Sequence, residues 1–239
     1  MDIEISGSGT SNGGDCGKIR IAGSGKICGA AHCETFEAAG SVHAFEDILC
    51  DGTLSAAGSA HFDKNVTAQK IEAAGSFHAD GNVTFSEIGK FSGAVHIGGD
   101  VKGGKTKACG ALKVGGGIEA DELVLEGAIT CEGLVNAETI DIRFENTSKS
   151  GIGSAGGSKI EIKPRKDMLG KVFFFPRVTR VFDVAESIEG DDISLSYVSA
   201  PAVVGKRVKI GKGCKIGKVQ YSESIDISED AVVEATEII

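Results

Sequence analysis

Tryptophan is absent from this chain of 239 residues, and aromatic residues make up only 5% of it. Proline and methionine are scarce as well, with 3 and 2 residues. No run of about 18 apolar residues occurs, which excludes a membrane-spanning helix. The start, Met1-Asp2-Ile3-Glu4-Ile5, is acidic and lacks the apolar core of a signal peptide. We therefore expect a cytoplasmic location.

The usual marks of ligand-processing chemistry are also missing. The net charge of −9 argues against nucleic-acid binding, because no broad cationic face is available for phosphates. No phosphate-binding loop, nucleophile–base pair or metal-ligand spacing is found. None of the 7 cysteines forms a C-x-x-C pair, and Cys33, Cys50 and Cys131 fall at inward positions as small buried residues. The sequence predicts a protein that is not an enzyme and needs no cofactor.

What the chain does have is glycine, 35 residues of it, much of it in a repeat. One glycine returns every 16 to 18 residues and is each time followed by Ser or Ala; these column glycines are Gly7, Gly23, Gly40, Gly58, Gly75, Gly93, Gly110 and Gly127. This period is too short for helical repeats, which need about 33 residues or more. It suits one turn of a β-solenoid, whose turns bury their inner faces only by stacking on one another.

The residues between the glycines alternate as strands with one buried face. The second and fourth residues after each column glycine are apolar or small, as in Val42/Ala44 and Ala60/Phe62. Two further inward pairs follow in each turn. Strictly six-residue strands would indicate a left-handed helix, whereas the alternation of 17 and 18 favours the right hand. We predict an all-β fold, a right-handed parallel β-helix with three short strands in each turn of 17–18 residues.

Two kinds of corner residue accompany this repeat. A second glycine stands six residues after the first in most turns, for example at Gly29 and Gly81, and we expect it to adopt a positive φ. Asp47, Asn65, Asn82 and Asp100 are expected to stack at another corner, where such side chains bond their own backbone.

The repeat fails after Phe144 and resumes near Ile188. We therefore predict a main solenoid over residues 1–162, an insert over 163–184 and a short solenoid over 185–239. The insert contains Phe173, Phe174 and Phe175, and residues 159–180 hold seven basic against two acidic side chains. The phenylalanines either plug the open end of the first solenoid or, with the basic residues, contact the inner face of a membrane.

Four of the five histidines sit three residues after a column glycine: His43, His61, His78 and His96. That parity points outward, so we expect a surface column with neighbouring turns about 4.8 Å apart. The column is either a solvated polar ladder or a weak candidate for a metal- or pH-responsive site.

Two segments carry a resemblance to a known family: Gly93-Ala94-Val95-His96-Ile97-Gly98-Gly99-Asp100-Val101 and residues 126–138, which read EGAITCEGLVNAE. They resemble the bactofilins, polymer-forming bacterial cytoskeletal proteins. Residues 188–193 and 208–214 are similar to a longer, two-part branch found in Gram-positive bacteria. The resemblance implies a right-handed β-helix that assembles end to end into filaments without nucleotide. It also implies a scaffold that localises envelope, shape or motility machinery.

Two departures from that family bear on assembly. Ile3 and Ile5 already fit a first strand where the family has a membrane-seeking tail, and the insert is placed to cover an end. Partners are therefore further copies of this chain or a sister protein. The candidate interface residues are Ile3, Ile5, Phe173, Phe174, Phe175, Ile225, Ile227 and Val233. The alternatives are a left-handed hexapeptide-repeat acyltransferase-like trimer, and a binding module that uses the histidine column.

Overall fold

The computed structural model describes residues 2–145, 149–165 and 181–239. These residues form parallel β-strands and no helix, and the chain is an all-β parallel β-solenoid. Among them no helix is long and apolar enough to cross a membrane. The chain divides into two compact units, Met1–Ala120 and Asp121–Ile239.

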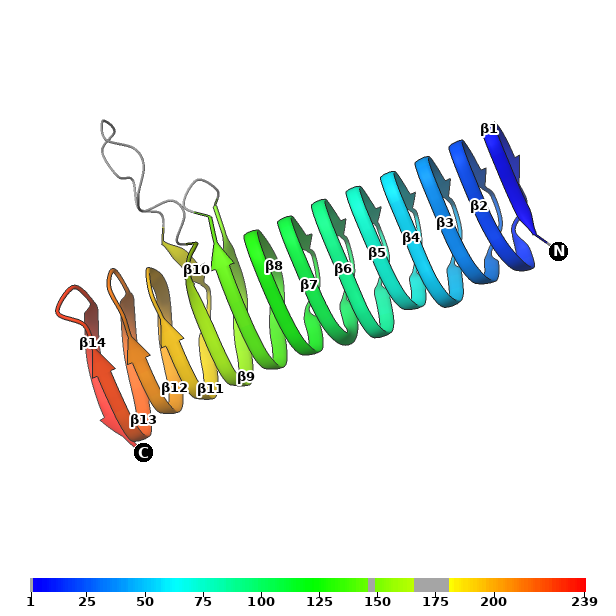
Figure 1. Cartoon of the computed structure of the whole chain (residues 1–239). Helices are drawn as coiled ribbons and strands as arrows, with labels where there is room; N and C mark the ends of the chain where they lie inside the picture. The colour runs from blue at the N-terminus through cyan, green and yellow to red at the C-terminus, as the bar shows by residue number, and fades with distance from the viewer. Residues whose placement is uncertain (1, 146–148, 166–180) are drawn as a thin grey trace, which may run out of the picture. The chain divides into compact units, whose positions relative to one another are not determined.

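The first unit stacks one long bent strand per turn, in sequence order (Figure 1). Its strands are β1 (Ile3–Ser11), β2 (Gly14–Ile27), β3 (Ala31–Ala44), β4 (Ile48–Phe62), β5 (Val66–Ala79), β6 (Val83–Ile97) and β7 (Val101–Val114), followed by the first residues of β8 (Ile118–Phe144). Neighbouring strands pair in parallel with equivalent residues aligned, as in Ala44 opposite Phe62. The alternating inner positions form the core predicted from the sequence.

The column glycines align from turn to turn through the first unit and have positive φ angles, 117° at Gly58 for example. A Cβ on Gly58 would lie 2.2 Å from the carbonyl oxygen of Gly40, so the stacking itself demands glycine. The expectation for the second glycines was wrong. Only Gly13 among them has a positive φ, of 77°, while Gly29 and Gly81 do not. Close approach between turns does not by itself select the left-handed region, since a Cβ on Gly29 would also lie 2.2 Å from a carbonyl oxygen, that of Asn12.

The Asp/Asn corner is stacked as predicted, but its hydrogen bonds run between turns. The Asn65 amide N–H donates to Asp47 Oδ1 at 3.0 Å, and Asn82 N–H donates to Asn65 Oδ1 at 2.9 Å. Asp100 N–H continues the ladder to Asn82 Oδ1 at 2.8 Å. Each side chain thus satisfies the backbone of the next turn and fixes the register between turns.

The second unit contains most of β8 and the later strands. These are β9 (Gly151–Pro164), β10 (Phe182–Val184), β11 (Ser187–Leu195), β12 (Val198–Ile210), β13 (Lys215–Ile227) and β14 (Val232–Ile238). β9 pairs with β8 on one side and with both β10 and β11 on the other. The second unit has aligned core residues of its own, such as Ile160, Ile193 and Val208, all 2% exposed or less.

Candidate functional site

The last turns of the second unit expose apolar side chains that are buried everywhere else in their columns. Along one column, Ile162, Leu195 and Ile210 are 0%, 1% and 0% exposed, but the next member, Ile227, is 40% exposed. Ile225 follows Val208 in the adjacent column and is only partly buried. No strand among the described residues therefore covers the inner columns at Ile225 and Ile227.

Among the described residues, β14 lies beside only part of β13. It pairs with β13 only from Lys215 to Tyr221 and leaves Ser224–Ile227 without a neighbour on that side among the described residues. β14 itself pairs with β13 alone. Its exposed face adds Val232 at 59% and Ile238 at 71%. We call Ile225, Ile227, Val232, Val233 and Ile238 the C-terminal edge.

Charge does not dominate this edge, although residues 219–239 contain six acidic and no basic side chains. Four of the six pair with bases from preceding turns. The pairs are Glu223 with Arg207, Asp226 with Lys209, Asp230 with Lys212 and Glu237 with Lys218. The exposed apolar side chains are thus the main feature of the C-terminal edge.

The edge formed by β1 is better closed. Ile5 is 8% exposed and Ile3 partly buried, against 1% and 0% for Ile21 and Ile19 in the next turn. Within the described residues β1 pairs only with β2, so its outer backbone groups are free to accept another strand. Phe173, Phe174 and Phe175, and most of the insert predicted over 163–184, lie outside the described residues.

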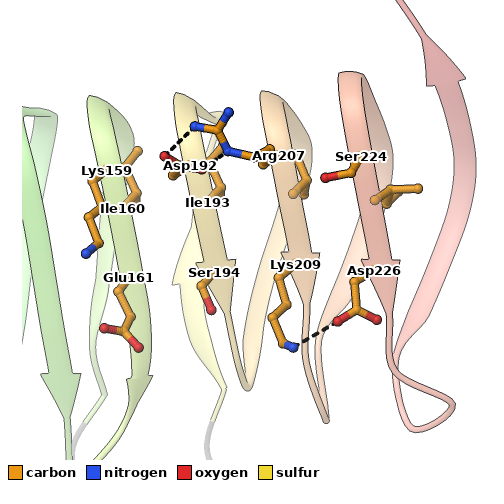
Figure 2. A pocket seen from close by; sticks show the side chains of 12 residues that line it. Lys159, Ile160, Glu161, Asp192, Ile193, Ser194, Arg207, Lys209, Ser224 and Asp226 are labelled. Atoms are coloured by element: carbon orange, nitrogen blue, oxygen red, sulfur yellow. Dashed lines mark hydrogen bonds and ion pairs between the residues drawn. The ribbon is translucent and has the colours of Figure 1, made fainter.

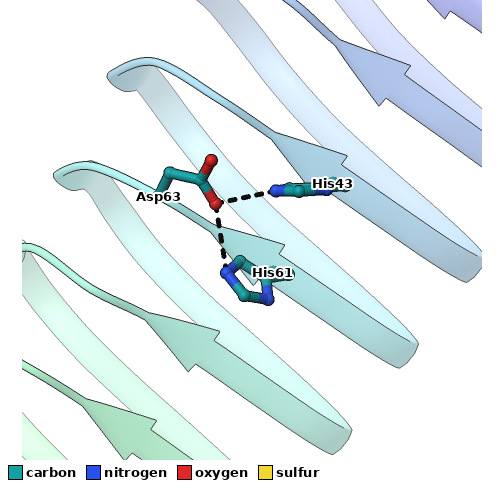
Figure 3. Close-up of side chains that lie close together, drawn as sticks. All are labelled: His43, His61 and Asp63. Atoms are coloured by element: carbon teal, nitrogen blue, oxygen red, sulfur yellow. Dashed lines mark hydrogen bonds and ion pairs between the residues drawn. The ribbon is translucent and has the colours of Figure 1, made fainter.

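The four histidines lie on the outer face of β3 to β6, aligned residue to residue. Their ring centroids are 4.7, 4.5 and 4.7 Å apart along the column. Two carboxylates run beside them. Asp63 Oδ1 lies 2.7 Å from His43 Nε2 and 3.1 Å from His61 Nε2, as Figure 3 shows. Asp80 lies 2.7 Å from His78 Nε2 and 3.8 Å from His61 Nε2.

The electrostatics differ along this column. The hydrogen bond from His78 holds the pKa of Asp80 below its usual range. Burial, aided by the nearby charges of His78 and Lys113, lowers the pKa of His96. His96 has no carboxylate within ion-pair distance among the described residues and so favours the neutral imidazole.

The fifth histidine also has carboxylate partners, which sequence reasoning missed. His32 lies 2.9 Å from Asp51 and 3.3 Å from Asp15, and the hydrogen bond to Asp51 raises its pKa. The signal was present: Asp15 and Asp51 lie 17 residues before and 19 after His32, one turn away on each side.

The cysteines form a second, inward column. Cys16, Cys33 and Cys50 are aligned on successive turns, and the last two are 1% exposed. A hydrogen bond from Cys33 lowers the pKa of Cys50 to about 7, whereas the same bond and burial raise that of Cys33. The inward placement predicted for Cys33, Cys50 and Cys131 is confirmed. Because Cys33 and Cys50 are buried, this cysteine column is part of the hydrophobic core.

A pocket of about 420 Å³ crosses β9, β11, β12 and β13 in the second unit (Figure 2). Four of its charged side chains form two ion pairs: Arg207 Nη2 lies 2.7 Å from Asp192 Oδ2, and Lys209 lies 2.8 Å from Asp226. These groups neutralise one another and do not converge on a common ligand position.

Comparison with known proteins gives two partial similarities. The uncharacterized protein YhbE of Bacillus subtilis (strain 168) is 33% identical over 104 residues, which is 44% of this chain and 42% of YhbE. The uncharacterized protein YhbF of the same organism is 35% identical over 89 residues, 37% of this chain and 34% of YhbF. The aligned parts therefore span less than half of either relative. No family model and no solved structure matches the chain.

Proposed function

We propose that this protein is a structural scaffold of the bactofilin type that assembles end to end into filaments without nucleotide. The supporting observation is the C-terminal edge, where Ile227 is 40% exposed although Ile210, its counterpart one turn earlier, is fully buried. Full burial of such a side chain is worth about 1.5–3 kcal/mol, so a few of them provide a substantial driving force. A further solenoid turn from another chain would restore the missing neighbour.

The favoured first contact joins the C-terminal edges of two copies, or of one copy and a sister protein. Contact between like ends gives a closed two-fold interface, and a second contact at β1 would extend the dimer into a filament. Because most acidic groups at the C-terminal edge are already paired, repulsion between two copies is small and is screened further by salt.

The proposed scaffold has a defined handedness and a defined cellular location. We take the solenoid to be right-handed, with three short strands in each turn of 17–18 residues. The scaffold acts in the cytoplasm, at the inner face of the membrane where residues 163–184 supply the contact. It localises envelope, shape or motility machinery and carries out no catalysis.

Sedimentation velocity and negative-stain electron microscopy of the purified protein, without nucleotide, test this proposal. A reducing agent is needed because Cys28 and Cys109 are exposed. We expect filaments or sheets that grow with protein concentration and persist at high salt. Monomers at every concentration would overturn self-assembly. Discrete trimers would instead support the acyltransferase-like alternative.

A further inference from the structure

We propose that the outer face of the first unit binds one late first-row divalent metal ion, Zn²⁺ being the reference ion, through the histidine column and its two aspartates. Two groups of three ligands are present: His43, His61 and Asp63, and His61, His78 and Asp80. Within each group the ligand atoms lie within 4.8 Å of one another.

The donor geometry needs little change to hold an ion. Zinc binds imidazole nitrogen and carboxylate oxygen at about 2.0–2.2 Å, which places tetrahedral donors roughly 3.4 Å from each other. In the first group, Asp63 Oδ1 lies 2.7 and 3.1 Å from the Nε2 atoms of His43 and His61. An ion would replace the proton of the His43–Asp63 hydrogen bond, which is released to water, and would lengthen these two nitrogen–oxygen distances by less than about 1 Å.

The strand pairing already holds these metal-binding side chains close together. His43, His61 and His78 occupy equivalent positions of β3, β4 and β5, so the strand pairing fixes their spacing. Asp63 and Asp80 follow the last residues of β4 and β5 and reach back to the imidazoles. The ring of His43 packs on Phe45 with centroids 4.0 Å apart, which restricts its rotation. An ion bound here would link consecutive turns of the solenoid.

The donor chemistry selects the class of ion. Neutral imidazoles with one carboxylate suit Zn²⁺, Co²⁺, Ni²⁺ and Cu²⁺, whereas Mg²⁺ and Ca²⁺ prefer oxygen ligands alone. The histidine side chains are 34–43% exposed in both groups, so an ion can reach them. Three protein ligands leave at least one position for water.

Both groups use His61 Nε2, and one nitrogen lone pair binds one ion. Occupation of one group therefore excludes full occupation of the other, which sets the stoichiometry at one ion per chain. His96 stacks on His78 in the same column but belongs to neither group. It provides a control of the same residue type in the same column.

The test is isothermal titration calorimetry of chelator-treated protein with Zn²⁺, in a Cys28→Ser/Cys109→Ser background that removes the exposed thiols. We expect one ion per chain. His61→Gln disrupts both groups and should weaken binding by more than about tenfold, the lower limit for loss of a supporting residue. His96→Gln should change the affinity by less than twofold.

Two further measurements guard against indirect effects. Asp63→Asn/Asp80→Asn keeps the shape of both side chains and should weaken binding as His61→Gln does, with an unchanged circular dichroism spectrum. Co²⁺ should give the intense visible absorption of a site with fewer than six ligands. Equal Zn²⁺ affinity in the wild type and His61→Gln would overturn the proposal, as would no binding at 100 µM Zn²⁺.

Discussion

The middle turns of the first unit and the last turns of the second differ in how their inner columns end. Phe62 is fully buried, with Phe36 and Phe77 on either side at ring distances of 6.1 and 5.3 Å. Ile227 occupies an inner position too, yet it is 40% exposed because, among the described residues, it has a neighbouring strand on one side only. The same alternating pattern thus builds a buried core in one place and an exposed apolar edge in the other.

The two regions also differ in what joins their turns. The first unit has ion pairs between turns, such as Lys18 with Glu37, and in addition the stacked column glycines and the Asp/Asn corner that accepts backbone N–H groups. The second unit relies on ion pairs between turns, such as Arg207 with Asp192 and Glu223. Exposed pairs of this kind are screened by water and salt and contribute little. We therefore expect substitutions in the first unit to have the larger effects.

The largest difference should come from truncating one core residue in each region. Phe62→Ala removes a fully buried ring and should lower the free energy of unfolding by about 3–5 kcal/mol. Ile227→Ala should cost less than about 1 kcal/mol in the unassembled protein, since its side chain is already partly in water. Urea unfolding followed by circular dichroism measures both. Similar losses would mean that the edge is covered in solution.

A second comparison sets a column glycine against a glycine of the second unit. Ala at Gly58 would need a φ near 117° and would meet the Gly40 carbonyl oxygen at 2.2 Å, so we expect a loss of at least about 2 kcal/mol. Gly156→Ala meets nothing closer than 3.2 Å and should change stability by less than about 0.5 kcal/mol. Thermal melting compares the two. Equal melting temperatures would show that the column glycines are not required.

Two histidines should make stability respond to pH in opposite directions. Folding lowers the pKa of His96. Its contribution to the free energy of unfolding is therefore lost as the pH falls from about 6.5 toward the lowered pKa. Folding raises the pKa of His32, whose contribution is present at acid pH and lost as the pH rises through the raised value.

Melting temperatures at pH 5.5 and 7.5 test this pair. His96→Gln should reduce the destabilisation at pH 5.5, and His32→Gln should increase it. The charge of Asp80 raises the pKa of His96 and so opposes the effect of burial. We therefore expect His96→Gln to change the melting temperature only modestly. The same pH response in both variants would contradict the opposite pKa changes assigned to His96 and His32.

The smallest effect is expected for the ion pairs of the second unit. Arg207→Ala removes contacts to Asp192 and Glu223, whose side chains are nearly half exposed. Its melting temperature should fall by less than about 2 °C, and by less still in 0.5 M salt. A fall above about 5 °C would show that these pairs hold the second unit together.

The repeat made most of the fold predictable. Glycine spacing set the length of each turn, and the period of two identified inner residues such as Val42 and Phe62, both buried. The steric need for glycine at position 58 was not predictable in the same way. A Cβ there would clash with the carbonyl oxygen of Gly40, and this contact arises only when the turns are stacked.

The site was predictable in part. The parity of His43, His61 and His78 indicated an outward column, but the role of the aspartates was missed. The signal was the pattern His-x-Asp, repeated at His61 and His78, which places a carboxylate beside its own imidazole and that of the preceding turn. Ile227 was among the interface residues predicted from the sequence, but its exposed fraction could not be predicted, because it depends on which residues of β13 pair with β14.

Electron microscopy of two matched variants tests the central claim most directly. Ile238→Lys places a charge on the C-terminal edge at a side chain that is 71% exposed. Leu49→Lys makes the same change at an apolar residue that is 43% exposed on the side of the solenoid. We predict that wild type and Leu49→Lys form filaments and that Ile238→Lys does not, although all three melt alike. Filaments of Ile238→Lys as abundant as those of the wild type would contradict assembly through this edge.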